Sequence, residues 1–185
     1  MNFCSQCGEK VRLAVPEGDD RPRYLCDACG TIHYQNPRIV AGTLPVLGDK
    51  VLLCRRAIAP RKGYWTLPAG YMENAETTRE AGLRETWEEA TASVELKELY
   101  TLIDLPHINQ VYMIFLAELR GDFAPGVESL EVALFDERDI PWGELAFPTI
   151  ERTLAHFFED RRAGRFSLHM STITPEDRER YFGSA

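Results

Sequence analysis

The segment GYMENAETTREAGLRETWEEATA, residues Gly70 to Ala92, decides the fold of this chain. It places three carboxylates, Glu85, Glu88 and Glu89, at spacings of three and four residues. At 100° per residue they gather on one side of a helix, where like charges oppose helix formation by roughly 0.2 to 0.5 kcal/mol per pair. A hard divalent cation such as Mg²⁺ or Mn²⁺ would remove this conflict, and it would leave positions for water and phosphate. A solvated acidic helix face is the alternative interpretation.

The same segment predicts how the helix starts and packs. Thr77, followed three residues later by Glu80, predicts a capping box at the first turn. Four residues, Leu83, Trp87, Ala90 and Val94, fall on roughly the side opposite the carboxylates, so they predict the packing face. Arg84 stands four residues after Glu80, a spacing that predicts an ion pair between them.

The spacing of the charged residues distinguishes a metal site from a solvated acidic helix face. Gly70, five residues, Glu76, seven residues and then the run Arg84 to Glu89 resemble the box of Nudix hydrolases, which requires G, five residues, E, seven residues and R-E-U-x-E-E-x-G-U, with U aliphatic. Thr86 replaces an aliphatic residue, and Thr91 stands where the family has glycine. That glycine normally ends the helix in a left-handed conformation, which a β-branched threonine disfavours.

The resemblance implies an α/β (α+β) fold, the Nudix α/β/α sandwich with a mixed sheet, and hydrolysis of a nucleoside diphosphate linked to another moiety. By position it implies that Glu85 and Glu89 are the principal Mg²⁺ or Mn²⁺ ligands and that Glu88 is a third ligand or a base. It further implies that the Gly70 carbonyl is a backbone ligand and that Glu76 and Arg84 orient the carboxylates. Relatives resembling this chain carry another metal-linked glutamate where Glu131 stands, although a glutamate beside a strand is often simply exposed.

A second motif lies near the amino terminus. Two CxxCG knuckles supply Cys4, Cys7, Cys26 and Cys29, at the spacing of a four-cysteine zinc site. Four thiolates complete tetrahedral Zn²⁺ and leave no open position, so the site is predicted to be structural. Short strands at 11–15 and 23–25, around a turn at 17–20, predict a zinc ribbon. Two disulfides are the competing interpretation.

Charge and composition limit the partners. The net charge is −8, and basic and acidic residues are balanced up to Arg38, whereas a nucleic-acid surface needs a basic stripe. We therefore expect the ribbon to act as a scaffold or interface element and not to bind nucleic acid. No apolar run reaches membrane-spanning length, and with cysteines usable as thiolates and no signal segment we expect a cytoplasmic protein. Nudix relatives of this kind imply a homodimer.

The chain divides at Asn36-Pro37, since the residue before proline resists helix. We predict a zinc ribbon at 1–35, a Nudix domain at 36–163 and a tail with a short helix at 164–185. Apolar patterns predict strands at 39–47, 51–56, 111–119 and 132–135, a covering helix at 149–162, and a last helix that starts at Thr174-Pro175.

The substrate is predicted from weaker signals. Pro106 follows the box by a distance that resembles ADP-ribose pyrophosphatases, and segments such as Tyr34-Gln35-Asn36-Pro37 and Phe123-Ala124-Pro125-Gly126 resemble the plant FAD and ADP-ribose pyrophosphatase branch. The implied reaction cleaves FAD or ADP-ribose to AMP plus FMN or ribose 5-phosphate. The candidate substrate-binding residues are Arg55, Arg56, Trp65 and Pro106, with core packing as the alternative for Trp65.

Other functions remain open at this stage. NADH pyrophosphatases also join a zinc ribbon to a Nudix domain, but their SQPWPFP-like signature is missing here. Dinucleoside polyphosphates and capped RNA are further substrate classes. A non-catalytic Nudix-like sensor that binds a nucleotide and uses its ribbon on a partner or DNA would tolerate loss of the box carboxylates, which this chain retains.

Overall fold

The amino-terminal unit is a small three-stranded antiparallel sheet. A computed structural model describes residues 1–182, which divide into two units between Pro37 and Arg38. The first contains β1 (Arg12–Ala14), β2 (Arg23–Leu25) and β3 (Ile32–His33), in that spatial order. Gly8 and Gly30 follow the two knuckles with φ of +79° and +72°, and their N–H groups donate to the Cys4 and Cys26 carbonyls. The predicted ribbon strands are confirmed.

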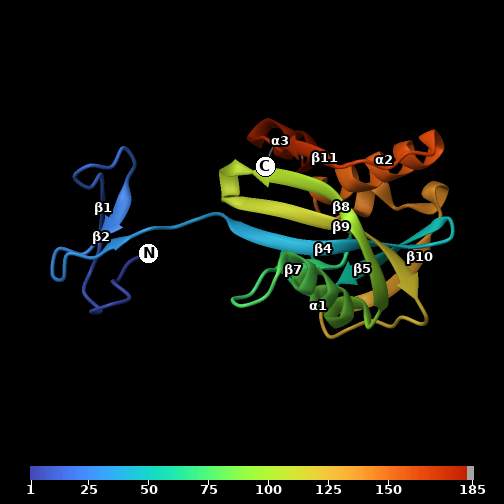
Figure 1. The fold of residues 1–185 in the computed structure, drawn as a ribbon, viewed down its shortest axis with the longest axis horizontal. Coiled ribbons are helices and arrows are strands. Elements are labelled where there is room, and N and C mark those ends of the chain that lie inside the picture. Colours follow the sequence, from blue (N-terminus) through green and yellow to red (C-terminus); the bar gives the residue numbers. More distant parts are fainter. Residues whose placement is uncertain (183–185) are drawn as a thin grey trace. The chain divides into compact units, whose positions relative to one another are not determined.

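The second unit is built on an eight-stranded mixed sheet (Figure 1). Its main path runs β10-β5-β4-β9-β8-β11, with β6 paired to β5 and β7 paired to β4. The β4–β9 and β8–β11 pairs are parallel, and the other pairs are antiparallel. The strands are β4 (Arg38–Leu47), β5 (Lys50–Arg56), β6 (Trp65–Thr66), β7 (Ala69–Tyr71), β8 (Ser93–Leu105), β9 (Gln110–Arg120), β10 (Ser129–Phe135) and β11 (His169–Thr172).

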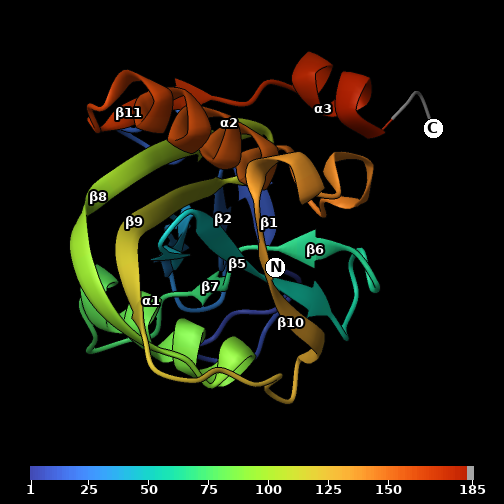
Figure 2. The ribbon, with the colours of Figure 1, turned by 90° about the vertical axis from the view of Figure 1, so that its right-hand side faces the viewer.

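Helices cover both faces of this sheet. Figures 1 and 2 show α1 (Thr78–Ala90) on one face, with α2 (Pro148–Ala163) and α3 (Pro175–Phe182) on the other. Three 3₁₀ turns complete the unit: η1 (Pro106–Ile108), η2 (Glu137–Asp139) and η3 (Trp142–Glu144). The predicted α/β/α sandwich with a mixed sheet is therefore confirmed. Among the helices of residues 1–182, none combines the length and apolar character that a membrane span requires.

The main core lies between α2 and the sheet. It is formed by aromatic and aliphatic side chains of α2 packed on β4, β5 and β9: Ile150, Leu154, Phe157, Phe158, Leu44, Val51, Leu53 and Ile114. Each is almost fully buried, and burying one such side chain contributes about 1.5 to 3 kcal/mol. This packing fixes the start of α2 relative to β4 and β9.

The packing face predicted for α1 is wrong for its two large side chains, although Ala90 is buried as predicted. Leu83 and Trp87 are 40% and 56% exposed. Besides Ala90, the buried side carries Thr86, Glu89 and a glycine, Gly82. A Cβ added at Gly82 would come within 3.3 Å of a backbone oxygen of β4, so small residues are what let this helix approach the sheet closely. The contact therefore depends on small side chains and not on the large apolar ones.

Five strands were not predicted: the short β3, β6 and β7, and the longer β8 and β11. Strand β8 is 13 residues long, but register shifts between Leu96 and Leu99 and between Leu99 and Thr101 break the two-residue alternation that would have revealed it. Strand β11 lies in the segment assigned to a tail and extends the main sheet beside β8. The last three positions of that predicted tail, 183–185, lie outside the described residues.

Candidate active site and structural metal site

The loop before α1 and the first turn of the helix are fixed by their own side chains. Thr77 Oγ1 accepts from the Glu80 N–H at 3.2 Å, and Glu80 Oε2 accepts from the Thr77 N–H at 2.8 Å. The predicted capping box is confirmed. The predicted Arg84–Glu80 ion pair is wrong, because the Glu80 carboxylate is engaged by the cap and Arg84 turns to other partners.

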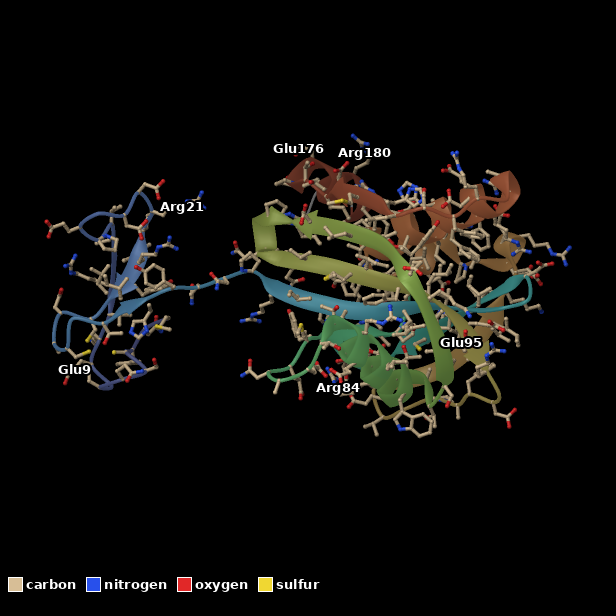
Figure 3. The ribbon with its side chains drawn as sticks, in the orientation of Figure 1. Glu9, Arg21, Arg84, Glu95, Glu176 and Arg180 are labelled. Carbon is tan, nitrogen blue, oxygen red and sulfur yellow. The ribbon has the colours of Figure 1, made fainter. Side chains whose placement is uncertain are left out.

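Arg84 ties the loop and the helix carboxylates together. Its Nε and Nη2 donate to both oxygens of Glu76 at 3.0 and 2.8 Å, and Nη1 donates to Glu85 at 2.7 Å and Glu88 at 3.1 Å. Nη2 also donates to the Tyr71 carbonyl on β7. Figure 3 shows Arg84 on the α1 side of the sheet. The hydrogen bonds from Arg84 lower the pKa of Glu76, so this carboxylate is charged at neutral pH.

Glu89 and Glu85 are the buried acids of the group. Glu89 is 7% exposed, and its Oε2 accepts from the Ala69 N–H at 3.1 Å. Burial raises the pKa of Glu89 to about 8, and it also raises the pKa of Glu85 against the opposing effect of Arg84. A Cβ added at Gly70 would lie 2.4 Å from the Glu85 carboxyl, so only glycine lets this acid lie against β7.

These acids line one wall of a cavity of about 1120 Å³. Glu85, Glu88 and Glu89 all contribute, and so does Glu128, whose charge raises the pKa of both Glu85 and Glu89. The loop before Glu128 is bound to the end of α1, where the Gly126 N–H donates to the Glu89 carbonyl at 3.0 Å. The sequence signal for Glu128 is its place immediately after the Pro125-Gly126 turn, outside the strand.

Several predicted site residues lie elsewhere. Glu131 is exposed on β10, 3.6 Å from Arg55, and Arg55 Nε donates to the Gly63 carbonyl. Neither residue lines the cavity. Trp65 is buried in the main core, edge-on to Phe135 at 4.8 Å, so its alternative interpretation, core packing, is the one observed.

Two other candidates lie at or near the cavity. Arg56 lines it, and its guanidinium carbon lies 5.2 Å from the ring centre of Phe147. Pro106 starts η1, and its neighbours Leu105 and His107 line the cavity while Pro106 itself does not. The structure thus brings Arg56 to the carboxylates' cavity, and it gives Pro106 only an indirect place beside it.

The two threonines that depart from the family box are both accommodated. Thr91 takes the left-handed conformation, with φ 47° and ψ 32°, and its N–H donates to the Trp87 carbonyl. The helix therefore ends where the family glycine would end it, despite the cost of this conformation for a β-branched residue. The buried Thr86 hydroxyl donates to the Gly82 carbonyl at 2.7 Å and shares a hydrogen bond with the Thr43 hydroxyl at 2.6 Å.

The carboxylate wall fits a hard divalent cation. Every side-chain donor in it is a carboxylate oxygen, the type that Mg²⁺ and Mn²⁺ prefer. Burial without a bonded cationic partner raises the pKa of Glu89, and a cation would restore its charged form. The carboxylates do not converge tightly, however, because Arg84 holds Glu85 and Glu88. Within residues 1–182, the one group of ligand-type atoms that all lie within 4.8 Å of one another is formed by cysteines.

That group is Cys4, Cys7, Cys26 and Cys29. Their sulfurs are 3.7 Å apart for Cys4–Cys29 and 3.4 Å apart for Cys7–Cys26, close to the roughly 3.8 Å expected between thiolates bound at about 2.3 Å to tetrahedral zinc. All four are free, so the disulfide interpretation is wrong and the residues fit a structural zinc ion.

Two neighbours of these sulfurs were not foreseen. His33 Nε2 lies 3.3 Å from the Cys4 sulfur, and the Thr31 hydroxyl lies 3.1 Å from the Cys29 sulfur. Groups of this kind orient metal ligands and stabilise their charge. His33 has no ligand spacing in the sequence, and only the pairing of β2 with β3 brings it to the cluster.

Comparison with protein families agrees with both sites. A family model described as NUDIX domain matches residues 36–159, and a zinc-ribbon model described as Nudix N-terminal matches residues 2–35. The chain belongs to the Nudix family and carries an amino-terminal zinc ribbon.

Individual proteins that resemble this chain include a NUDIX hydrolase, an NAD-capped RNA hydrolase and an ADP-ribose pyrophosphatase. A crystal structure of a NUDIX hydrolase from Nitrosomonas europaea is 55% identical, with a TM-score of 0.91 over 94% of this chain and 99% of that one. The NAD-capped RNA hydrolase NudC of Stutzerimonas stutzeri is 30% identical over 168 residues, 88% of this chain and 58% of that protein. The ADP-ribose pyrophosphatase of Methanocaldococcus jannaschii is 30% identical over 120 residues, 62% of this chain and 69% of that protein. The chain thus spans less than two thirds of the NudC protein's length.

Proposed function

We propose that this chain hydrolyses the diphosphate of a nucleotide in which AMP is linked to a second moiety. The observation that supports this most directly is the buried Glu89, which lines a large cavity together with Glu85, Glu88 and Glu128. A protein that only needed a stable helix would not bury a carboxylate so deeply that burial raises its pKa, since that arrangement costs stability. A site for a metal and a diphosphate explains the arrangement.

Each residue has a proposed part. Glu85, Glu89 and the Gly70 carbonyl would hold Mg²⁺ or Mn²⁺, which when bound neutralises the diphosphate and lowers the pKa of water. Glu88 and Glu128 are the carboxylates available to take a proton from the attacking water. Arg84, with Glu76 behind it, is a positioning residue that sets where Glu85 and Glu88 lie.

For the substrate, we propose ADP-ribose and FAD, cleaved to AMP plus ribose 5-phosphate or FMN. The cavity of about 1120 Å³ exceeds the roughly 300 to 1,000 Å³ usual for small-molecule sites, so a dinucleotide-sized ligand fits. The similarity to a protein named ADP-ribose pyrophosphatase supports the first of the two.

NAD and NAD-capped RNA form the second candidate class. The specific observation is that the similarity to the NAD-capped RNA hydrolase of Stutzerimonas stutzeri covers 88% of this chain, which is more than the Nudix domain at 36–159 alone. ADP-ribose, FAD and NAD share an adenosine diphosphate, so both candidates require recognition of the same half of the substrate.

We also propose that the protein is a homodimer in the cytoplasm. The resemblance to Nudix relatives supports the dimer, and five free cysteines suit a reducing compartment. Sedimentation of the purified protein and cell fractionation would test the two proposals separately.

A substrate panel tests the proposed function. The zinc-loaded protein is incubated with FAD, ADP-ribose, NADH or a dinucleoside polyphosphate, each with Mg²⁺ or Mn²⁺, and release of AMP is measured. We expect release from ADP-ribose and FAD that depends on the added metal. Faster release from NADH would favour the second candidate. A folded protein that releases AMP from no substrate with either metal would contradict the proposal.

A further inference from the structure

Two buried polar atoms on the cavity wall are not used by the proposed chemistry. Thr149 is 1% exposed, and its Oγ1 has no hydrogen-bond partner within the described residues. The Nδ1 atom of His107 is also buried and also has no hydrogen-bond partner there. Both residues line the cavity that holds the carboxylates. More than nine in ten buried polar groups in native proteins are hydrogen-bonded, so two unbonded atoms in residues that line one cavity require an explanation.

Thr149 also lies in the first turn of a helix that lacks its own cap. Phe147 is the N-cap residue of α2 and its side chain makes no cap hydrogen bond, and Pro148, which follows, has no N–H. Helix α1 differs, because Thr77 and Glu80 satisfy its first turn. The start of the 16-residue α2 therefore presents its partial positive charge and the Thr149 hydroxyl without a capping side chain.

Hydrogen bonds bring α2 and η1 to the same region. The Arg152 side chain of α2 donates to the Thr172 carbonyl at 2.8 Å. The backbone N–H of the next residue, Ile173, donates to the backbone carbonyl of Asp104 at 2.9 Å. Asp104 lies near the end of β8, which runs directly into η1 and His107. The start of α2, the end of β11 and the 3₁₀ turn thus form one continuous part of the wall.

The rest of this wall is mainly apolar and aromatic. Its lining side chains are Val40, Leu105, Tyr112, Phe147 and Ile173, with Arg56 beside Phe147. An extra phosphate would lose its hydration against these apolar side chains, with the guanidinium groups of Arg56 and Arg61 in return, and a sugar would find few partners for its hydroxyls. A planar base suits the wall better, because its faces are apolar and its edge carries a few directed polar atoms.

We propose that Thr149 and His107 form a base-recognition subsite that hydrogen-bonds the edge of the adenine in the AMP half of the substrate. This inference deepens the proposed function and rests on it for the identity of the nucleotide. The Thr149 hydroxyl donates to a ring nitrogen acceptor of the base. The Nδ1 atom of His107 accepts from the exocyclic amine. Thr149 and His107 are then specificity-determining residues, outside the chemical step.

The test uses product binding by the zinc-loaded full chain. Affinity for AMP and for inosine 5′-monophosphate, which reverses the donor and acceptor pattern on the base edge, is measured by calorimetry for the wild type and Thr149→Val. We expect the wild type to prefer AMP. Thr149→Val should lose about 5- to 50-fold in AMP affinity and most of this preference, since it removes the hydroxyl at nearly constant shape.

Thermal unfolding separates a binding role from a structural one. Because the Thr149 hydroxyl has no protein partner, Thr149→Val should leave the melting temperature of the nucleotide-free protein unchanged or raise it. Thr153→Val is the matched control, one turn further along α2. Its buried hydroxyl donates to the Thr149 carbonyl at 2.8 Å and shares a hydrogen bond with Thr101 at 3.1 Å. This control should lower the melting temperature and leave AMP affinity unchanged.

Each remaining outcome distinguishes the subsite from the enzyme. Unchanged AMP affinity and preference in Thr149→Val would overturn the subsite and show that its hydroxyl binds ordered water only. If Thr149→Val fails to fold, His107→Phe tests the same subsite and should reduce the preference for AMP. Loss of preference in a protein that releases no AMP from any substrate would support the subsite and refute the hydrolase. Normal turnover by the wild type, with an unchanged preference for AMP in Thr149→Val, would support the hydrolase and refute the subsite.

Discussion

The cysteine cluster and the carboxylates that line the cavity, for each of which we propose a bound cation, differ in how closely their ligand atoms are grouped. The four sulfurs lie within 4.8 Å of one another on two turns of the amino-terminal unit. The carboxylates of α1 stay apart, because Arg84 binds Glu85 and Glu88 while Glu89 is bonded to the strand. A site that serves only structure uses every ligand position on the protein. A site for chemistry keeps positions for water and substrate, so it needs fewer and less convergent protein ligands.

Removing zinc should give the largest effect and mark the boundary between the two regions. A unit of 37 residues has little core of its own, so a chelator should unfold residues 1–37 and leave the second unit folded. Hydrogen exchange resolved along the sequence measures this. Cys26→Ser should bind no zinc, while Cys54→Ala, which alters the buried cysteine of the second unit, should retain about one zinc per chain. If residues 1–37 were equally protected from hydrogen exchange with and without zinc, the amino-terminal unit would not depend on zinc to fold.

Glu89→Gln should change the other region alone. It removes the charge that Glu89 would carry with a cation bound, at constant size, and we expect turnover to fall roughly 1000-fold, equivalent to several kcal/mol of lost transition-state stabilisation. Zinc content and the melting temperature should not fall. Steady-state kinetics with Mg²⁺, with zinc analysis beside them, measures both. Near wild-type turnover would show that Glu89 does not hold the metal.

The stability of the second unit should depend on pH through Glu89. Burial raises its pKa from the ordinary 4.5 to about 8, so between these values the folded state binds the extra proton. That stabilisation is complete below pH 4.5. The free energy of unfolding then falls by roughly 1.4 kcal/mol for each pH unit, and the stabilisation is lost once the pH has risen through about 8. Urea unfolding without added Mg²⁺ or Mn²⁺ measures the loss. Glu89→Gln should flatten the profile, and a profile that it leaves unchanged would assign the effect to another group.

Glu128→Gln and Glu131→Gln test which acid outside α1 belongs to the wall. Glu128 lines the cavity with the α1 carboxylates, whereas Glu131 is exposed beside Arg55. We expect Glu128→Gln to lower kcat about 10- to 100-fold, as for loss of a general base or a ligand neighbour, and Glu131→Gln to change it less than about threefold. The reverse order would restore the sequence-based assignment of Glu131.

Thr91→Gly should give the smallest effect, at the end of the carboxylate helix. Thr91 has a φ of 47°, which is costly for a β-branched residue, so glycine should raise the free energy of unfolding by about 1 kcal/mol. The shift in urea midpoint measures it. Thr91→Ala, which keeps a Cβ, should recover less of this energy. A less stable Thr91→Gly would mean that contacts of the threonine side chain outweigh the backbone strain.

The local features of both sites could be predicted from the sequence because they depend on short spacings. The two knuckles and the capping box each involve residues within four positions, and the structure confirms the predicted cap. The buried face of α1 could not be predicted the same way. Hydrophobicity favours burial of Leu83 and Trp87, whereas close approach of the helix to β4 requires the small side chains next to Gly82. The structure buries the side next to Gly82 and leaves Leu83 and Trp87 exposed.

Tertiary contacts explain the remaining differences. The bulges in β8 hide its alternation, so a 13-residue strand has no simple pattern. Glu128 enters the wall through a loop that only the folded chain places beside α1, and His33 reaches Cys4 through strand pairing. Arg55 and Arg56 are adjacent in sequence, and the direction of each side chain from β5 decides that only Arg56 lines the cavity.

The attachment of the 124–128 loop to α1 has a mechanical consequence. The Ala124 and Gly126 N–H groups donate to the Ala90 and Glu89 carbonyls, and a Cβ added at Gly126 would lie 1.7 Å from a backbone oxygen of the helix. These contacts attach the loop to the helix end, so they fix Glu128 relative to Glu85, Glu88 and Glu89. Any adjustment to ligands of different length must then come from the other rim, where His107 and Phe147 stand. Substrate choice can thus drift over evolutionary time without disturbing the chemistry.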